Sequence, residues 1–161
     1  MNKFAKYRCL TPVQKEIRIK IMDFIIETGG PVNIDKTKEY ICRKMNLEET
    51  YASEVLKQFI DTNVMVMEGD NISFIFPVSG HPTNHAITLA DGRKFCAMCA
   101  IDSIGTNFTF GQDVEVNSVC SSTGKPLKLK VSDGKVVYTD NPDLRIIHIN
   151  LEKHSEWASS C

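Results

Sequence analysis

The spacing of the apolar residues changes partway along the chain, and this change restricts the possible folds more than any other feature. Up to residue 61, apolar residues recur every three or four positions, as they do on one face of a helix. From residue 64 onward, apolar and polar residues alternate in short runs separated by turn residues, as they do in β-strands. Helices followed by strands predict an α+β fold.

Three helices are predicted before residue 62. The first carries Ile17, Ile21 and Ile25 on one face, and Thr11 before a first-turn proline is a suitable N-cap. The sequence Gly-Gly-Pro at 29–31 then ends this helix, because glycine and proline disfavour its continuation. The predicted helices cover residues 11–28, the segment from a cap at Asn33 or Asp35 to about Met45, and residues 47–61.

A β-hairpin is predicted directly after these helices. Residues 64–76 alternate around the turn sequence Glu-Gly-Asp-Asn at 68–71. Three helices followed by a hairpin is the order of a winged helix. We therefore predict that residues 1–79 form an N-terminal winged-helix-like domain.

The charges of this domain argue against a nucleic-acid partner. The third helix, which would enter the DNA groove, carries Glu48, Glu49, Glu54 and Asp61 against the single base Lys57. DNA affinity depends on basic residues that neutralise phosphates. The whole chain is also balanced, with 19 basic and 20 acidic residues. We expect no nucleic acid to bind, and we expect the helices to act as a scaffold or a lid.

The second half of the chain is predicted to be mainly antiparallel. Residues 77–82 contain two prolines and a glycine and are expected to join two domains. Residues 80–161 then make the second domain. We expect it to pack on the first, because each half is small for independent stability. The predicted elements are strands at 85–89 and 94–98, a short helix at 99–108, and strands at 113–119, 126–132, 136–139 and 144–151.

The sequence favours a cytoplasmic protein with reduced thiols. The N-terminal residues have no apolar stretch of the kind found in a secretory signal, and no apolar run approaches the roughly 18 residues of a membrane span. We expect no membrane partner. Scattered cysteines in such a chain indicate thiols rather than a disulfide framework. The six cysteines are Cys9, Cys42, Cys96, Cys99, Cys120 and Cys161.

Cys96 and Cys99 have the spacing of a zinc knuckle or a redox pair. A structural zinc site needs four ligands, and the remaining two would come from Cys120 and one histidine. The candidate histidines are His81, His85, His148 and His154. A redox pair normally precedes a long helix in a βαβ unit, which this half lacks. The simpler interpretation makes Cys96 a small apolar residue of a strand.

Cys99 and Asp102 form the most distinctive pair in the sequence. If a helix begins near residue 99, the two side chains share one face of its first turn. A thiol at a helix N-terminus is acidified by the unpaired N–H groups there, and the thiolate is the species that binds metals. Asp102 either stabilises the helix start or exchanges a proton with Cys99.

The other candidates have simpler interpretations. Cys120 precedes a turn and is expected to be a buried thiol at a strand end. His85 and His148 lie among apolar residues and are expected to be core or edge histidines. Cys161 is the last residue of the sequence.

Two motifs give the chain a resemblance to the organomercurial (alkylmercury) lyase family. These are Cys-Ala-Ile-Asp at 99–102 and Cys-x-x-Thr-Gly-x-Pro at 120–126, with a glycine at 111 before a valine-rich strand. The similarity is specific over residues 77–131 and weaker in the N-terminal half and the tail. Members of the family also carry a winged-helix-like N-terminal part.

The resemblance implies roles for individual residues. The two cysteines and one aspartate that cleave the carbon–mercury bond fall on Cys99, Cys161 and Asp102, which would also hold the Hg(II) product. Cys120 falls on a structural thiol, and Cys96 falls where the family has no required cysteine. The family continues beyond the position of Cys161, so residues 80–161 are expected to form an incomplete lyase-like domain. A UGA codon for selenocysteine that is read as a stop is one hypothesis for such an end.

The resemblance also implies a chemistry. Soft thiolates bind mercury in preference to hard ligands, and Asp102 would take a proton from a thiol and pass it to carbon. The products are a hydrocarbon and thiolate-bound Hg(II). No cofactor is implied. Excess small-molecule thiol would release the mercury, and a thiol acceptor or a mercuric reductase-like protein would then receive it. One alternative is a non-catalytic metal or organometal carrier with the same thiol site. A zinc-bound or winged-helix DNA-binding regulator is a third.

Overall fold

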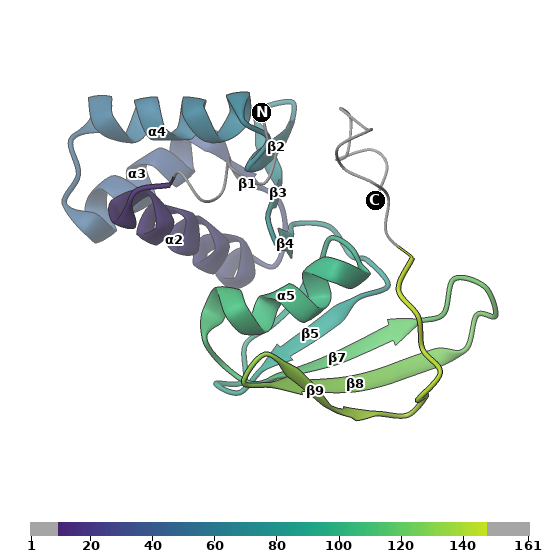
Figure 1. Cartoon of the computed structure of the whole chain (residues 1–161). Coiled ribbons are helices and arrows are strands. Elements are labelled where there is room, and N and C mark those ends of the chain that lie inside the picture. Colours follow the sequence, from purple (N-terminus) through teal and green to yellow (C-terminus); the bar gives the residue numbers. More distant parts are fainter. Residues whose placement is uncertain (1–9, 148–161) are drawn as a thin grey trace.

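The computed structural model describes residues 10–147, and they form an α+β fold (Figure 1). Three helices precede most of the strands, and the fourth described helix lies against the sheet of the second half. The helices are α2 (Pro12–Thr28), α3 (Ile34–Met45), α4 (Glu49–Asp61) and α5 (Ala100–Phe110). The strands are β1 (Val32–Asn33), β2 (Met65–Glu68), β3 (Asn71–Ile75), β4 (Val78–Ser79), β5 (Ala86–Leu89), β6 (Lys94–Ala97), β7 (Val114–Val119), β8 (Pro126–Ser132) and β9 (Lys135–Thr139).

The ends of α2 and α3 follow the signals in the sequence. Thr11 caps α2 through a reciprocal pair of hydrogen bonds with Gln14, and Gly29 ends this helix with a φ of 73°. A left-handed backbone of this kind suits glycine, which has no Cβ to clash. Asn33 caps α3, where its side chain accepts from two backbone N–H groups. The predicted bounds of both helices are confirmed.

Helix α4 begins later than predicted, at Glu49 rather than at residue 47. The reason is the end of α3. Asn46 takes a left-handed conformation there, and the N–H of Leu47 donates to the Cys42 carbonyl at 3.1 Å. Leu47 is therefore part of the preceding helix cap, which apolar periodicity alone does not distinguish from a helical turn.

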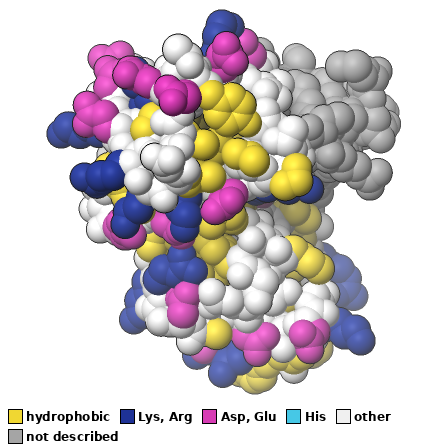
Figure 2. Space-filling model, turned by 90° about the vertical axis from the view of Figure 1, so that its left-hand side faces the viewer, with side chains coloured by type: hydrophobic (Ala, Val, Ile, Leu, Met, Phe, Trp, Pro, Cys, Tyr) yellow, Lys and Arg dark blue, Asp and Glu magenta, His cyan; other side chains and the backbone are white. Residues whose placement is uncertain are grey.

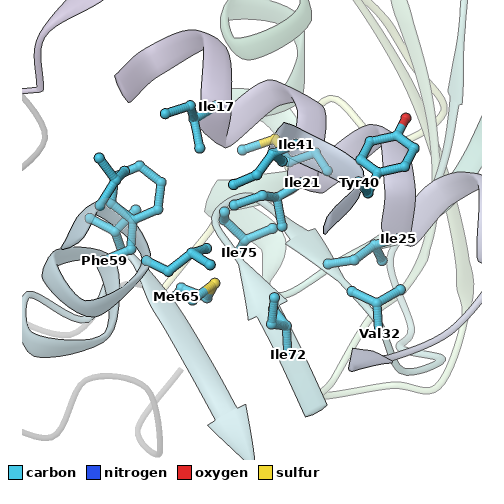
Figure 3. Close-up of a cluster of buried hydrophobic side chains, with 14 of the residues drawn as sticks. Ile17, Ile21, Ile25, Val32, Tyr40, Ile41, Phe59, Met65, Ile72 and Ile75 are labelled. Carbon is cyan, nitrogen blue, oxygen red and sulfur yellow. The ribbon is translucent and has the colours of Figure 1, made fainter. Parts of the chain in front are cut away.

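The largest hydrophobic core lies between the three N-terminal helices and the β2–β3 hairpin (Figure 3). Ile17 and Ile21 of α2, Ile41 of α3 and Phe59 of α4 are fully buried there against Ile75 of β3. These residues occupy the helical and alternating positions that the sequence pattern indicates.

Within residues 10–147, the strands form one nine-stranded sheet, and neighbouring strands pair in antiparallel orientation. The predicted joint at 77–82 contains strand β4, which pairs with β3 on one side and β6 on the other. The sheet is therefore continuous across the joint. The hairpins β2–β3 and β5–β6 and the β7–β8–β9 meander lie where the alternation predicts strands.

One predicted strand is wrong in its described part: residues 144–147 are not in a strand. Ile147 is 97% exposed, so its apolar side chain does not join the sheet core. The rest of that predicted strand, residues 148–151, lies outside the described residues. The two-domain division and the winged-helix assignment stay predictions. Within residues 10–147, no helix is both long enough and apolar enough to cross a bilayer.

Candidate functional site

A pocket of about 410 Å³ lies where α5 meets the sheet of the second half. It is lined by the first turns of α5, by residues before β5, by β7 and β8, and by residues 144–147. Three side chains that bear the relevant chemistry line it: Cys99, His85 and Cys120. The strand order places β5 beside β7, and α5 packs on this part of the sheet (Figure 1). Sequence segments more than thirty positions apart therefore meet at one pocket.

Cys99 and Asp102 are joined as the helical spacing predicts. Cys99 is the N-cap residue of α5, with an extended backbone, and its sulfur accepts from the Asp102 N–H at 3.5 Å. The thiol of Cys99 donates to Oδ2 of Asp102 at 3.2 Å. Both side chains are partly exposed. A thiol proton therefore already points at a carboxylate oxygen, which is the arrangement needed for proton exchange between the two groups.

Cys96 lies away from the Cys99–Asp102 pair. It lies on β6, where its Sγ is 3.8 Å from the carbonyl oxygen of Thr83, and it is not among the described residues that line the pocket. This is the strand position that the simpler interpretation predicts. In residues 10–147, no three His, Cys, Asp or Glu side chains are grouped closely enough to hold a metal ion together.

Cys120 directly follows β7, and it is half-buried rather than buried. Hydrogen bonds from the Thr123 hydroxyl and from the N–H groups of Thr123 and Ser122 lower the pKa of the Cys120 thiol. Such donors favour the thiolate because they stabilise its negative charge. The sequence does not reveal this role for the turn, since serine and threonine after a strand are ordinary turn residues.

His85 lines the pocket, a position that the sequence does not indicate. Its Nδ1 lies 2.9 Å from the Ser118 hydroxyl, and burial lowers the pKa of the imidazole, which favours its neutral form. The prediction of a core or edge histidine is consistent with this half-buried position before β5. Only the antiparallel pairing of β5 with β7 brings residues 85 and 118 together, and no local pattern signals that pairing.

The remaining wall is partly apolar, with Arg145 and several serines among its polar residues. Ile101 and Ile104 of α5 face it together with Val116 of β7 and Leu129 of β8. Apolar side chains beside the Cys99 thiol suit a ligand that has a hydrocarbon part and a soft metal centre.

Other candidate residues lie elsewhere or are not described. His81 is 2.9 Å from a carboxylate oxygen of Glu68, in the hairpin of the first half. His148, His154 and Cys161 lie outside the described residues. The pairing of Cys99 with Cys161 therefore stays a prediction.

Known proteins resemble the chain in sequence and in structure. The family model for alkylmercury lyase matches residues 78–161. Alkylmercury lyases of Bacillus cereus and Clostridium butyricum are each 34% identical to the chain over 68 residues. Those residues make up 42% of this chain but only 30% of each relative.

A solved structure of the mercury-bound form of MerB2 matches with a TM-score of 0.64 and 25% identity. The match covers 88% of this chain and 66% of that one. The family model covers more than half of the chain and includes Cys99, Asp102 and Cys120. The chain therefore belongs to the alkylmercury lyase family.

Proposed function

We propose that the protein cleaves the carbon–mercury bond of organomercurials and releases a hydrocarbon. The observation that supports this most directly is the hydrogen bond to Asp102, at 3.2 Å, from the thiol of Cys99, a residue that lines a partly apolar pocket. Membership of the alkylmercury lyase family supports the same activity.

The proposed reaction begins when Cys99 binds the mercury of R–Hg(II). The thiol proton passes to the Asp102 carboxylate, to which it is already hydrogen-bonded. An ordinary aspartate has a pKa of about 3.9 and holds no proton at neutral pH, so the thiol has to supply one. Asp102 then donates the proton to the carbon as the carbon–mercury bond breaks. The hydrocarbon leaves, and Hg(II) stays on sulfur with no change in oxidation state.

The resemblance names Cys161 as the second thiol that pushes electron density toward the carbon. Two soft thiolates make the carbon more basic, which lowers the barrier to its protonation. The proposed reaction requires no cofactor. Excess small thiols then release the Hg(II), either to solution or to a thiol acceptor such as a mercuric reductase-like protein. This need for reduced thiols favours the cytoplasm as the place of action.

The N-terminal half is proposed to be a winged-helix-like scaffold, residues 1–79, packed on the lyase-like part, residues 80–161. Two acidic residues of α4 take part in surface ion pairs: Asp61 with Lys57 at 2.6 Å, and Glu49 with Lys38 of α3 at 3.0 Å. Acidic and basic side chains are also interspersed on the face shown in Figure 2. This pattern suits a scaffold better than a surface that follows a phosphate backbone.

Methane release from methylmercury with excess monothiol tests the proposal. The purified reduced chain is expected to release methane, and Cys99→Ser is expected to release none above the buffer blank. Cys96→Ser is the matched control, because it changes a neighbouring thiol that does not line the pocket. It should retain the activity of the unchanged protein.

Three outcomes would contradict parts of this account. Full activity in Cys99→Ser excludes the assigned nucleophile. Equal losses in Cys96→Ser and Cys99→Ser favour a shared CxxC metal site instead. Tight binding of methylmercury with no methane from the unchanged chain identifies a carrier rather than a lyase.

A further inference from the structure

The peptide group between Ala97 and Met98, one residue before Cys99, is held from two sides. Its carbonyl oxygen and its N–H lie in one rigid plane, because the peptide bond does not rotate freely. The Ala97 carbonyl accepts from the Thr83 hydroxyl at 2.6 Å. The Met98 N–H donates to the Pro77 carbonyl at 3.2 Å. Two other segments of the chain therefore fix the orientation of this plane.

On its other side, Cys99 is held by helix α5. Its carbonyl accepts from the Ser103 N–H at 2.9 Å, and its sulfur accepts from the Asp102 N–H at 3.5 Å. Between the fixed plane and the helix, the backbone turns only about the rotatable bonds of Met98 and Cys99. The orientation of the plane therefore influences where the Cys99 sulfur lies relative to the Asp102 carboxylate.

The Thr83 hydroxyl takes the place of a ladder hydrogen bond at the end of the β5–β6 pair. The register Ala86↔Cys96, continued by one step, sets His85 opposite Ala97. Two residues paired in this way exchange both of their backbone hydrogen bonds. One bond is direct, since the Ala97 N–H donates to the His85 carbonyl at 2.9 Å. In the other direction, the Thr83 hydroxyl lies between the two groups: it accepts from the His85 N–H at 3.1 Å and donates to the Ala97 carbonyl.

These two bonds also orient the hydroxyl itself. A threonine hydroxyl that accepts from the N–H two residues later forms a local turn, which fixes the direction of its oxygen. The proton of the Thr83 hydroxyl is then directed at the Ala97 carbonyl. Ala97 is fully buried, so loss of the hydroxyl leaves a buried carbonyl without this donor. The peptide plane before Cys99 would then be held on one side only.

We propose that Thr83 is a positioning residue for Cys99, whose hydroxyl fixes the Ala97–Met98 peptide plane and so keeps the Cys99 thiol directed at Asp102. The inference rests on the proposed function for the part that Cys99 plays in cleavage. Thr83 is not among the described residues that line the pocket, so it acts through the backbone. Its loss should therefore impair proton transfer more than the binding of mercury.

The kinetics of methane release from methylmercury test this role. Thr83→Val keeps the size of the side chain and removes the hydroxyl. Its kcat is expected to fall by about 10- to 100-fold, because a small misplacement of a reacting group costs up to about 10²-fold in rate. Its KM should change by less than about twofold, since the Cys99 thiol still binds mercury. Thr83→Ser keeps the hydroxyl and should restore most of the kcat.

Thr139→Val is the matched control. The Thr139 hydroxyl also donates to a carbonyl and accepts from an N–H, both of Asn141 and both at 3.1 Å, but it lies at the end of β9. This variant should keep the kcat of the unchanged protein. An unchanged kcat in Thr83→Val overturns the inference. Equal losses in Thr83→Val and Thr83→Ser, or in Thr83→Val and Thr139→Val, overturn it as well.

Alkylation of Cys99 gives a second readout that needs no cleavage. Its rate with iodoacetamide is followed against pH by peptide mass spectrometry, and Asp102→Asn supplies the profile of a thiol without its carboxylate partner. The profile of Thr83→Val should move from that of the unchanged chain toward that of Asp102→Asn, and Thr83→Ser should restore it. Cys42 of α3 is the internal reference and should react alike in all variants.

The two proposals can fail separately. A chain that releases no methane, but whose Cys99 profile moves in Thr83→Val, loses the proposed activity and keeps the positioning role. A chain that releases methane, with kcat and profile both unchanged in Thr83→Val, keeps the activity and loses the inference. Circular dichroism confirms that each variant is folded. If Thr83→Val does not fold, Thr83→Ala is compared with Thr83→Ser by the same two measurements and the same criteria.

Discussion

The Cys99 sulfur caps helix α5 and is also the proposed nucleophile, and these two roles depend on different properties of the thiol. As the N-cap of α5, its sulfur accepts a long hydrogen bond, 3.5 Å, from the Asp102 N–H. As the proposed nucleophile, the same sulfur donates its proton to the Asp102 carboxylate. Serine is among the preferred N-cap residues, whereas a thiol is a weak acceptor. Stability and activity should therefore respond in opposite ways to replacement of this sulfur by oxygen.

Cys99→Ser is predicted to unfold at the same temperature as the unchanged protein or at a higher one. The hydroxyl caps α5 at least as well as the thiol, so the expected change is between zero and about 1 kcal/mol of stabilisation. Thermal unfolding followed by circular dichroism measures it, with Cys99→Ala as the variant that has no cap. If Cys99→Ser unfolds at a temperature well below that of Cys99→Ala, the capping role is wrong.

Helix α5 is attached to the sheet by polar as well as apolar contacts: Ile104 and Phe110 pack against the apolar core of the second half. Its buried residues are Ser103, Thr106 and Asn107. The Asn107 amide nitrogen donates to the Gln112 carbonyl at 2.6 Å, and its oxygen accepts from the Gly134 N–H at 2.9 Å. Asn107 therefore ties the end of the helix to the β8–β9 turn, which fixes the orientation of the helix that carries Cys99 and Asp102.

Asn107→Ala is predicted to destabilise the protein by about 1–3 kcal/mol, because it leaves two backbone groups without their partner. Urea unfolding followed by circular dichroism gives the free energy. Asn117→Ala is the matched control, since Asn117 is exposed and its amide reaches only a Glu115 oxygen at 3.4 Å. Equal effects of the two substitutions would contradict the anchoring role of Asn107.

The sequence predicts elements of this kind better than their contacts. Helix α5 is predicted at residues 99–108 despite Gly105, and it is observed at Ala100–Phe110. The Cys99–Asp102 contact follows from helical spacing alone, because both residues lie in one turn. The roles of Asn107 and His85 are not visible in the same way, since each depends on a residue far along the chain, Gly134 and Ser118 respectively. The two-residue strands β1 and β4 are too short to give an alternating pattern.

At the scale of the whole molecule, Arg93 links three elements from both halves. Its guanidinium lies 2.6 Å from Asp23 of α2 and 2.8 Å from Asp91 of the β5–β6 turn. It also lies over the Phe110 ring at the end of α5, 5.2 Å from the ring centroid. The sheet is continuous through β4, so this cluster supports a connection that the backbone already makes.

The cluster predicts how stability depends on pH. Hydrogen bonds from Arg93, and then from Gln112, hold the pKa of the Asp91 carboxyl well below its usual range. A lowered native pKa means that the ionised carboxylate stabilises the fold above the ordinary aspartate pKa of about 3.9, and that this contribution is lost as the pH falls toward the native value. The Asp91 side chain is 38% exposed, so its contribution is at most about 1 kcal/mol.

Asp91→Asn should therefore lower the melting temperature slightly at neutral pH, and the difference from the unchanged protein should shrink in strong acid. Differential scanning calorimetry across this pH range measures the effect. Asp113→Asn, at an exposed position near the same turn, is the control. A difference that grows as the pH falls has the wrong sign and would exclude Asp91 as the titrating group.

The central claim is that Asp102 carries the proton from the Cys99 thiol to carbon. Asp102→Asn keeps the size of the side chain but has no carboxyl proton to pass on, so it separates binding from cleavage. The most direct measurement is methane released from stoichiometric methylmercury by the unchanged protein and by Asp102→Asn, alongside the mercury bound to each. The account predicts equal binding and a methane release that falls by a factor of about 10²–10⁴. Methane release from Asp102→Asn at the rate of the unchanged protein would contradict it.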